Sequence, residues 1–487
     1  MLGNIFRWNV SLEGDFGGLE EESHNFLFVC HHWFEVASHT PELWSFWGNT
    51  LEDWARWYHR SETAPLDLVL DDDVGDLGTT LRSALQDRAA ADRIRRVHLG
   101  TNGSKHLSTI IASLTAKCEG IRSNSMESLV LQNYRGVVNL SDFFAHYCFP
   151  KLRRLDLSNC LWGQLTLRTG ALTNLKLGFG CGPCLTTPQL HSILASNPML
   201  QRLALHGYAV PDPGDGKSSF RAPLHHLKEL ELVGYSRDVI MFLQRLDHPA
   251  NMDHLTLDME DCTTVEISQM IGPYLRDYLR RRGRSQNGLG LFLSSDRRIA
   301  LKVGDAHGTG PLLLQMDTFM RITLDLEEAL SNDAQEKVIL DLIAHAPQEE
   351  IVYFQSCGDP VAMENAYAQF PNLRTLSLEN IPLSSVFPWP NLGGDEGILL
   401  SLQCVFLREL VVDGGDWSSL TTFLARRASS GNCLNTLEIS CSPHMCPAVV
   451  ESIGGVVQKS KIERPDLPCA FGTCLRFSYF FLTKRGV

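Results

Sequence analysis

The spacing best suited to chemistry in this sequence is Cys181-Gly182-Pro183-Cys184, which matches the Cys-x-x-Cys pattern of thioredoxin-like oxidoreductases. That chemistry needs the first cysteine at a helix N-terminus, after a strand of a compact α/β domain, and here Gly180 precedes it. A structural zinc site would need a second matching pair, although His191 follows nearby. The pattern favours a turn that holds two thiols, with redox catalysis and zinc binding as less favoured alternatives.

Two further clusters have a simple physical explanation. His31 and His32 are adjacent in a predicted helix, so their side chains point about 100° apart and cannot chelate one metal ion. The run 280–284, Arg-Arg-Arg-Gly-Arg, could be a nuclear-import or phosphate-binding patch, but it also ends a helical stretch where cations favour the helix dipole. His-Glu-x-x-His, Gly-x-Ser-x-Gly and Walker spacings do not occur. The sequence therefore predicts no enzyme, no metal and no cofactor.

The net charge of the chain indicates which kinds of partner it is suited to bind. The 487 residues include 43 basic and 56 acidic side chains, which gives a net charge of −13. Such a chain is a poor match for nucleic acid or an anionic membrane surface. No apolar run reaches the ~18 residues of a membrane helix, and the opening MLGNIFRWNV lacks a signal-peptide core. We expect an intracellular protein, cytoplasmic and/or nuclear, in which the 14 cysteines stay reduced.

The first sixty residues predict a small helical module. Apolar residues recur at helical spacing over 26–37, and Pro41 ends that helix. Thr40 and Pro41 also predict the start of a second, short helix, and a third is predicted over 50–58. The second helix would carry Leu43, Trp44 and Trp47. A module of this size cannot enclose its own aromatic side chains, so it must pack on a neighbour or a partner.

From residue 61 onward, the pattern Leu-x-x-Leu-x-Leu recurs, most clearly over 152–157. Thirteen copies have their fourth position between residues 97 and 437, a mean period of about 28 residues, which is typical of leucine-rich repeats. Proline stands two residues ahead of three copies, at Pro150, Pro198 and Pro371. The pattern predicts a strand–helix solenoid with a parallel sheet, whose leucines point inward.

The residues between the paired leucines are predicted to form an exposed row on the outer face of the sheet. This row contains no charge cluster, metal set or acid–base pair, so it predicts a protein-binding surface. Its members would be His98, Val130, Asp156, Lys176, Ala204, Glu231, Thr256, Phe292, Thr323, Tyr353, Ser377, Val411 and Glu438. The residues predicted to contact a protein substrate are Asp156, Lys176, Glu231, Thr256, Phe292, Tyr353 and Ser377.

The stretch Val29-Cys30-His31-His32-Trp33-Phe34-Glu35-Val36-Ala37, followed by Thr40-Pro41-Glu42-Leu43-Trp44, resembles the second half of an F-box. It is similar to a fungal group of F-box-like proteins in which leucine-rich repeats often follow. That group usually opens with Leu-Pro-x-Glu-Ile, which this chain lacks, and only Ile5, Phe6 and Trp8 resemble the end of its first helix. The resemblance implies an α/β chain with an F-box-like helical module over 1–60, its first helix truncated, and an irregular leucine-rich-repeat solenoid over 61–487.

The same resemblance implies a function. The chain would be a non-catalytic substrate-recognition subunit of a cullin-type (SCF) ubiquitin ligase. Its F-box would dock on a Skp-family adaptor, and through it on a cullin, while the repeats bind a protein substrate. The adaptor-binding residues would be Val29, Trp33, Val36, Pro41, Leu43 and Trp44. The alternative is a leucine-rich-repeat interaction scaffold in which the F-box remnant is not functional.

Overall fold

The computed structural model divides into two compact units, one of residues 1–234 with 241–249 and the other of residues 235–240 with 250–487. The described residues are 29–47, 58–70, 89, 92–101, 125–134, 136–141, 144, 149–161, 171–179, 187–207, 222–247, 252–282, 289–295, 299–307, 315–326, 332–357, 369–379, 401–408, 417–440, 451, 453–454, 456–464 and 478–483.

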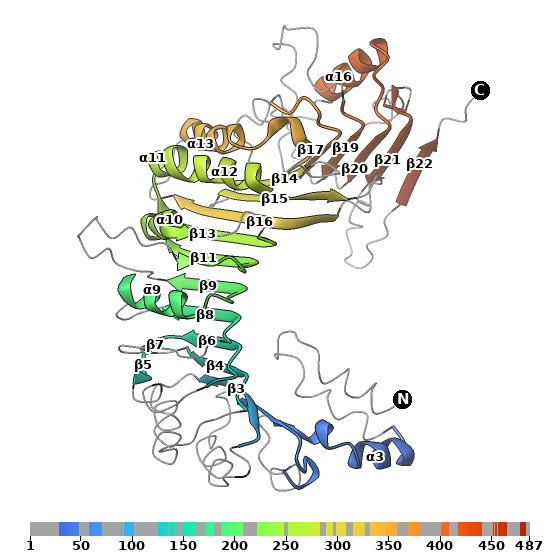
Figure 1. Ribbon diagram of the computed structural model, residues 1–487. Coiled ribbons are helices and arrows are strands. Elements are labelled where there is room, and N and C mark those ends of the chain that lie inside the picture. Colours follow the sequence, from blue (N-terminus) through green and yellow to red (C-terminus); the bar gives the residue numbers. More distant parts are fainter. Residues whose placement is uncertain are drawn as a thin grey trace. The chain divides into compact units, whose positions relative to one another are not determined.

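The first unit contains a parallel sheet whose strands follow one another in sequence order (Figure 1). Its strands are β1 (Phe46–Trp47), β2 (Leu66–Leu70), β3 (Ile94–Thr101), β4 (Ser128–Asn133), β6 (Arg154–Ser158), β8 (Asn174–Phe179), β9 (Arg202–Gly207) and β11 (Glu229–Tyr235). Two short parallel pairs accompany it, β5 (Val138–Asn139) with β7 (Cys160–Leu161) and β10 (Ala222–Pro223) with β12 (Leu246–Asp247). The sheet begins at β1, within the first sixty residues.

Alternation along these strands separates an inner from an outer face. Leu155 and Leu157 on β6 are buried, and their neighbours in register are leucines on β4 and β8. Four successive turns that precede strands also hydrogen-bond to one another, with the amide of Arg153 donating to Glu127, that of Thr173 to Arg153 and that of Gln201 to Thr173, at 2.7–2.8 Å. The repeats therefore stack through both their strands and their turns.

The Pro-x-Leu motif forms a tight turn. In Phe149-Pro150-Lys151-Leu152, the amide of Leu152 donates to the carbonyl of Phe149 at 3.2 Å, and the turns over 197–200 and 370–373 repeat this bond. Proline occupies the second position of each turn, where its fixed φ is favourable and its missing N–H is not needed. The prolines therefore set the direction in which the chain enters each strand.

The described residues of the first unit include few helices. They are α3 (His31–Ser38), the 3-10 helix η3 (Pro41–Trp44) and α9 (Thr187–Ser196), and α10 (Ser236–Arg245) crosses the boundary between the units. Figure 1 shows α9 beside β8 and β9. Leu190, Ile193 and Leu194 of α9 are buried, which covers the leucine side of the repeat. The expected second helix is shorter than predicted, because Trp47 lies on β1 rather than on a helix.

The second unit also contains a sheet that is parallel over most of its strands. The strands in sequence order are β13 (His254–Cys262), β14 (Leu289–Ser295), β15 (Ile299–His307), β16 (Gln315–Leu326), β17 (Ile351–Cys357), β18 (Thr375–Glu379), β19 (Cys404–Arg408), β20 (Thr436–Ser440), β21 (Lys459–Arg464) and β22 (Ser478–Thr483). Strands β17 to β21 pair in parallel and in sequence order, and β22 pairs antiparallel with β21.

An antiparallel insertion corrects the prediction of an unbroken parallel array. Strand β13 pairs with β16 rather than with β14, and β16, β15 and β14 are joined antiparallel before β14 pairs in parallel with β17. The alternation of Ile299, Leu301 and Val303 produces the extra strand β15, which has no Leu-x-x-Leu-x-Leu signature. The chain therefore has a mixed α/β fold with a large parallel sheet that is not closed into a barrel.

The described part of the second unit contains the helices α11 (Thr264–Glu266), the π-helix η5 (Ile267–Ile271), α12 (Gly272–Arg282), α13 (Asn332–Ala344), the 3-10 helix η6 (Gln348–Glu350) and α16 (Ser418–Ser429). A capping box starts the continuous stretch from α11 to α12, since the Thr263 hydroxyl accepts from the amide of Glu266 and the Glu266 carboxylate accepts from the amide of Thr263. Among the described helices, none combines the length and the apolar character needed to cross a membrane.

Candidate protein-binding surfaces

The row predicted on the outer face of the sheet exists in the first unit. Residues paired in register across β3, β4, β6, β8, β9 and β11 form one line along the sheet. Its members are His98, Val130, Asp156, Lys176, Ala204 and Glu231. The pairing of β2 adds Val69 beside His98. We call this line the first-unit row.

The prediction that this row is exposed to solvent is wrong for its shorter side chains. Asp156 is only 3% exposed, and Val130 and Ala204 are also buried, whereas the longer Lys176 and Glu231 are half-buried. The alternation of side chains along a strand determines which face of the sheet a residue occupies. Its solvent exposure also depends on the length of the neighbouring side chains. A short residue between long neighbours lies at the bottom of the row.

Asp156 is the most unusual member of the row. Its Oδ1 atom is buried and has no hydrogen-bond partner within the described part of the chain. Burial raises the pKa of this carboxyl group, although Lys176, Arg154, His98 and His206 all act in the opposite direction. The surrounding bases therefore do not compensate fully for the loss of water around this carboxylate.

Two ion pairs lie on strands β9 and β11, at the C-terminal end of the row, and one of them includes the row member Glu231. His206 Nε2 lies 3.1 Å from Glu231 Oε1, and this contact lowers the pKa of Glu231. Arg202 Nε lies 3.0 Å from Glu229 Oε2. Sequence reasoning missed His206 as part of the surface, although it stands two residues after Ala204 and so on the same face of the strand.

The pKa direction of Asp156 predicts how one substitution changes stability with pH. Because the folded-state pKa lies above the ordinary value of 3.8, the stability linked to this group is present below that value and is lost as the pH rises through the raised pKa. Asparagine has the same shape and does not ionise. We therefore expect Asp156→Asn to have a higher urea midpoint than the unsubstituted chain at about pH 7, with the difference shrinking toward about pH 4. A variant that is less stable than the unsubstituted chain at neutral pH would mean that the carboxylate has a stabilising partner.

The second unit has an outer row of its own, with a different membership from the predicted one. Register places Thr256, Arg321, Lys302, Phe292, Gln355, Ser377, Phe406 and Glu438 in line. Thr256, Phe292, Ser377 and Glu438 are therefore in the row, as predicted.

Two of the predicted members are displaced from this row. Tyr353 pairs with Thr375, one step before Gln355 on the same face of its strand, and Thr323 pairs with Asp258 rather than with Thr256. Strand β19 places Phe406 in the row, and the predicted member Val411 lies outside the described residues.

The side chains on the outer face of the second-unit strands are also less exposed to solvent than expected. Ser377 is only 5% exposed, Tyr353 is buried and the Phe406 ring is almost fully buried. The Tyr353 hydroxyl donates to Gln355 Oε1 at 2.7 Å, and burial raises its pKa. The polar side chains here bond to one another. Thr256 and Phe292 remain half-buried, and the Lys302 ammonium lies 4.6 Å from the centre of the Phe292 ring.

The residues predicted to meet an adaptor divide into an outer and an inner set. Val29 is 58% exposed, and Trp33, Val36 and Pro41 are half-buried. Leu43 and Trp44 are buried, so they pack inside the protein instead of offering a contact surface. Phe34, which the sequence analysis did not select, is 41% exposed on α3.

Trp44 connects α3 to the following segment. Its indole Nε1 donates to the carbonyl of Ala37 at 2.7 Å, and the Arg60 guanidinium lies 4.3 Å from the centre of its ring. The same guanidinium lies 5.8 Å from the Phe34 ring. Thr40, expected to cap the short helix, donates its hydroxyl to the carbonyl of Val36. These contacts hold α3 in one orientation.

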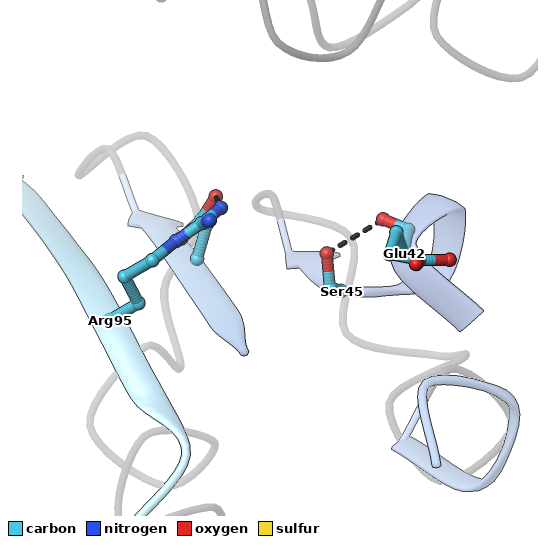
Figure 2. Close-up of polar contacts among 4 residues, drawn as sticks. Glu42, Ser45 and Arg95 are labelled. Carbon is cyan, nitrogen blue, oxygen red and sulfur yellow. Dashed lines mark hydrogen bonds and ion pairs between the residues drawn. The ribbon is translucent and has the colours of Figure 1, made fainter. Parts of the chain in front are cut away.

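The segment after η3 is bonded to the first strands of the sheet. The Ser45 hydroxyl donates to the carbonyl of Glu42 at 2.7 Å, as Figure 2 shows, and the Ser45 carbonyl accepts from the amide of Asp67. Arg95 of β3 then donates twice to the Asp67 carboxylate, at 3.0 and 2.6 Å. This hydrogen bonding to Asp67 raises the pKa of Arg95. The exposed face of α3 is thereby held on a rigid base.

The remaining sequence motifs do not form a catalytic site in the described residues. Within those residues, no group of three or more histidine, cysteine or acidic side chains is placed to bind a metal ion. His31 lies 3.5 Å from Glu35, one turn along α3. Arg282 is occupied by the Met252 carbonyl, by Asp305 and by the Phe319 ring. The Cys181–Cys184 motif lies outside the described residues.

Comparisons with known proteins add little to this picture. No family model and no curated protein matches the sequence. Among solved structures, the chain is similar to the crystal structure of the TLR13-ssRNA13 complex, with 12% identity and a TM-score of 0.28. That match covers 86% of this chain and 58% of the other. A TM-score this low establishes neither a common fold nor a common function.

Proposed function

We propose that this chain is a non-catalytic substrate-recognition subunit of a cullin-type (SCF) ubiquitin ligase. The N-terminal module docks on a Skp-family adaptor, and through it on a cullin. The outer faces of the repeat strands bind a protein substrate. The chain itself performs no chemistry; it raises the effective concentration of substrate lysines near the ubiquitin carrier.

The observation that carries this proposal is the exposed apolar surface around α3. Val29 and Phe34 are large apolar side chains that are exposed to solvent and stand five residues apart in the sequence. The hydrogen bond from Trp44 to the carbonyl of Ala37 holds this segment in place. Scattered exposed apolar residues need no explanation, but these two belong to the stretch that resembles an F-box. Exposed apolar side chains on a segment that is held in place support docking on a partner protein.

A second observation concerns the substrate. The first-unit row carries charged side chains of both signs in a fixed register, spaced by the strand separation of about 4.8 Å. Side chains set at regular intervals on a rigid sheet favour recognition of an extended protein segment. This supports a binding role for the repeats.

The adaptor contact can be tested with the full chain. We expect the double variant Val29→Asp/Phe34→Asp to capture at least about tenfold less purified Skp-family adaptor than the unsubstituted chain, because it places two charges in an apolar interface. Its melting temperature should change little, since both side chains are exposed in the free protein. Glu35→Gln on the same helix is the matched control and should capture adaptor normally. Equal capture by the double variant would contradict the proposed docking surface.

A second candidate function is an interaction scaffold whose F-box remnant is only structural. The burial of Leu43 and Trp44 favours it, because two of the six expected adaptor contacts serve the interior instead. In that case the chain would bind a protein through its repeats and capture no Skp-family adaptor. Adaptor capture by the unsubstituted chain therefore separates the two functions.

A further inference from the structure

Asp156 stands out among the charged side chains of the first-unit row because its carboxylate is buried and incompletely bonded. The residue is 3% exposed, and its Oδ1 atom has no hydrogen-bond partner within the described part of the chain. A buried carboxylate oxygen that lacks a donor is unfavourable, since the water it loses is not replaced. A bound group that donates a hydrogen bond to this atom would complete it.

The surroundings indicate what is missing. Lys176 is the register neighbour of Asp156, and Arg154 stands two residues before it on the same strand face. Neither donates to the buried Oδ1 atom. On the other side, the acidic groups Glu231 and Glu229 are already paired with His206 and Arg202. Within the described residues, Asp156 Oδ1 is therefore an acidic acceptor of this surface that lacks a donor.

We infer that Asp156 is the specificity-determining acceptor for an arginine or lysine side chain of a bound, extended protein segment. This inference rests on the proposed function, because it names the chemistry of the substrate that the repeats would take. A cationic side chain supplies both the hydrogen bond and the compensating charge, whereas a neutral donor supplies only the first. The net charge of −13 favours the approach of such a segment.

Access to Asp156 requires one neighbouring side chain to move. Lys176 is half-buried beside it and has a flexible four-carbon stem, so its ammonium group can swing away when a second cation enters. Val130 and Ala204 are too short to obstruct an incoming side chain.

A peptide selection tests this inference with the full chain. A library of random, extended twelve-residue peptides is selected on the unsubstituted protein, on Asp156→Asn and on Glu229→Gln. We expect the unsubstituted chain and Glu229→Gln, which removes one acidic charge from the same face, to enrich arginine or lysine at one position. We expect Asp156→Asn to lose that preference. Enrichment that survives in Asp156→Asn would overturn the inference.

A double-mutant cycle then shows whether the contact is direct. In the best selected peptide, the basic residue is replaced by citrulline, or by norleucine for lysine, and both peptides are titrated against both proteins. The replacement should weaken binding roughly tenfold with the unsubstituted chain and less than about twofold with Asp156→Asn. Equal losses with both proteins would mean that Asp156 does not receive the cation.

The outcomes also separate this inference from the proposed function. If the unsubstituted chain selects peptides without any basic preference, the role of Asp156 is wrong and the interaction surface stands. If it selects no peptide at all, both are wrong for this surface. A purely structural role for Asp156 predicts that Asp156→Asn loses stability as well, whereas we expect it to gain stability at neutral pH while losing the preference.

Discussion

Replacing Leu155 with aspartate is expected to lower the free energy of unfolding by at least about 4 kcal/mol, the largest stability loss that we predict. Leu155 is 0% exposed on β6, and its register neighbours on β4 and β8 are Leu129 and Leu175. The variant would lose the packing of a leucine and place a carboxylate among leucines that offer no hydrogen bond. Denaturant unfolding followed by circular dichroism measures the loss.

Two control variants distinguish the effect of burying a charge at position 155 from the effect of any substitution on this strand. Leu155→Met conserves volume and should cost less than about 1.5 kcal/mol. Asp156→Asn, one residue away on the opposite face, should be stabilising at neutral pH. Similar losses for Leu155→Asp and Asp156→Asn would mean that the two faces of the sheet have been assigned wrongly.

Replacing Trp44 with alanine is expected to lower the free energy of unfolding by about 3–5 kcal/mol. The ring is 3% exposed, donates to the carbonyl of Ala37 and stacks with Arg60, so the variant loses packing, a hydrogen bond and a cation–π contact together. Because these contacts also orient α3, adaptor capture should fall with them. The melting temperature of the full chain and the exchange of the α3 amides measure the two effects.

Trp33→Ala is the matched control for this prediction. Trp33 is half-buried on α3, so the substitution removes less packing and should cost clearly less than Trp44→Ala. From the sequence alone, Trp33 would be expected to be as important as Trp44 for the interior of the module. If Trp33→Ala proved the more destabilising of the two, the packing described for Trp44 would be contradicted.

The parts of the fold that local patterns determine could be predicted from the sequence. The alternation of leucines placed Asp156 and Lys176 in one row, and strand pairing confirms this register across the first unit. The recurrent Pro-x-Leu motif predicted where strands begin, and each copy forms a turn that directs the chain into a strand. Both features depend on neighbouring residues only, so a repeated local pattern is enough to reveal them.

The features that depend on distant residues were missed. Strand β15 does not carry the leucine-repeat pattern, and its alternation of Ile299, Leu301 and Val303 is typical of any half-buried strand. The pairing of β13 with β16 is what identifies β15 as part of an insertion. Both 402–407 and 407–412 fit the repeat pattern, and the structure places strand β19 in the first of these stretches, which the sequence alone did not distinguish. The burial of Ser377 likewise depends on what surrounds it, which alternation alone does not predict.

Asp156 illustrates why a site can conflict with local rules. The sequence predicted an exposed acidic residue, and the structure instead places a buried carboxylate on the outer face of the sheet. Because burial raises the pKa of this group, we expect the charged carboxylate to be less favourable for folding at neutral pH than an asparagine of the same shape. Such a residue is expected where binding needs a group that folding alone would not favour.

We propose that this chain joins a Skp-family adaptor to the repeats that hold a substrate. Size-exclusion chromatography with light scattering of this chain mixed with a purified Skp-family adaptor tests this directly. We expect one co-eluting complex with the mass of one chain and one adaptor, formed at concentrations of about 1–10 μM, in the range of specific protein–protein affinities. Separate elution of the two proteins at about 100 μM would contradict it.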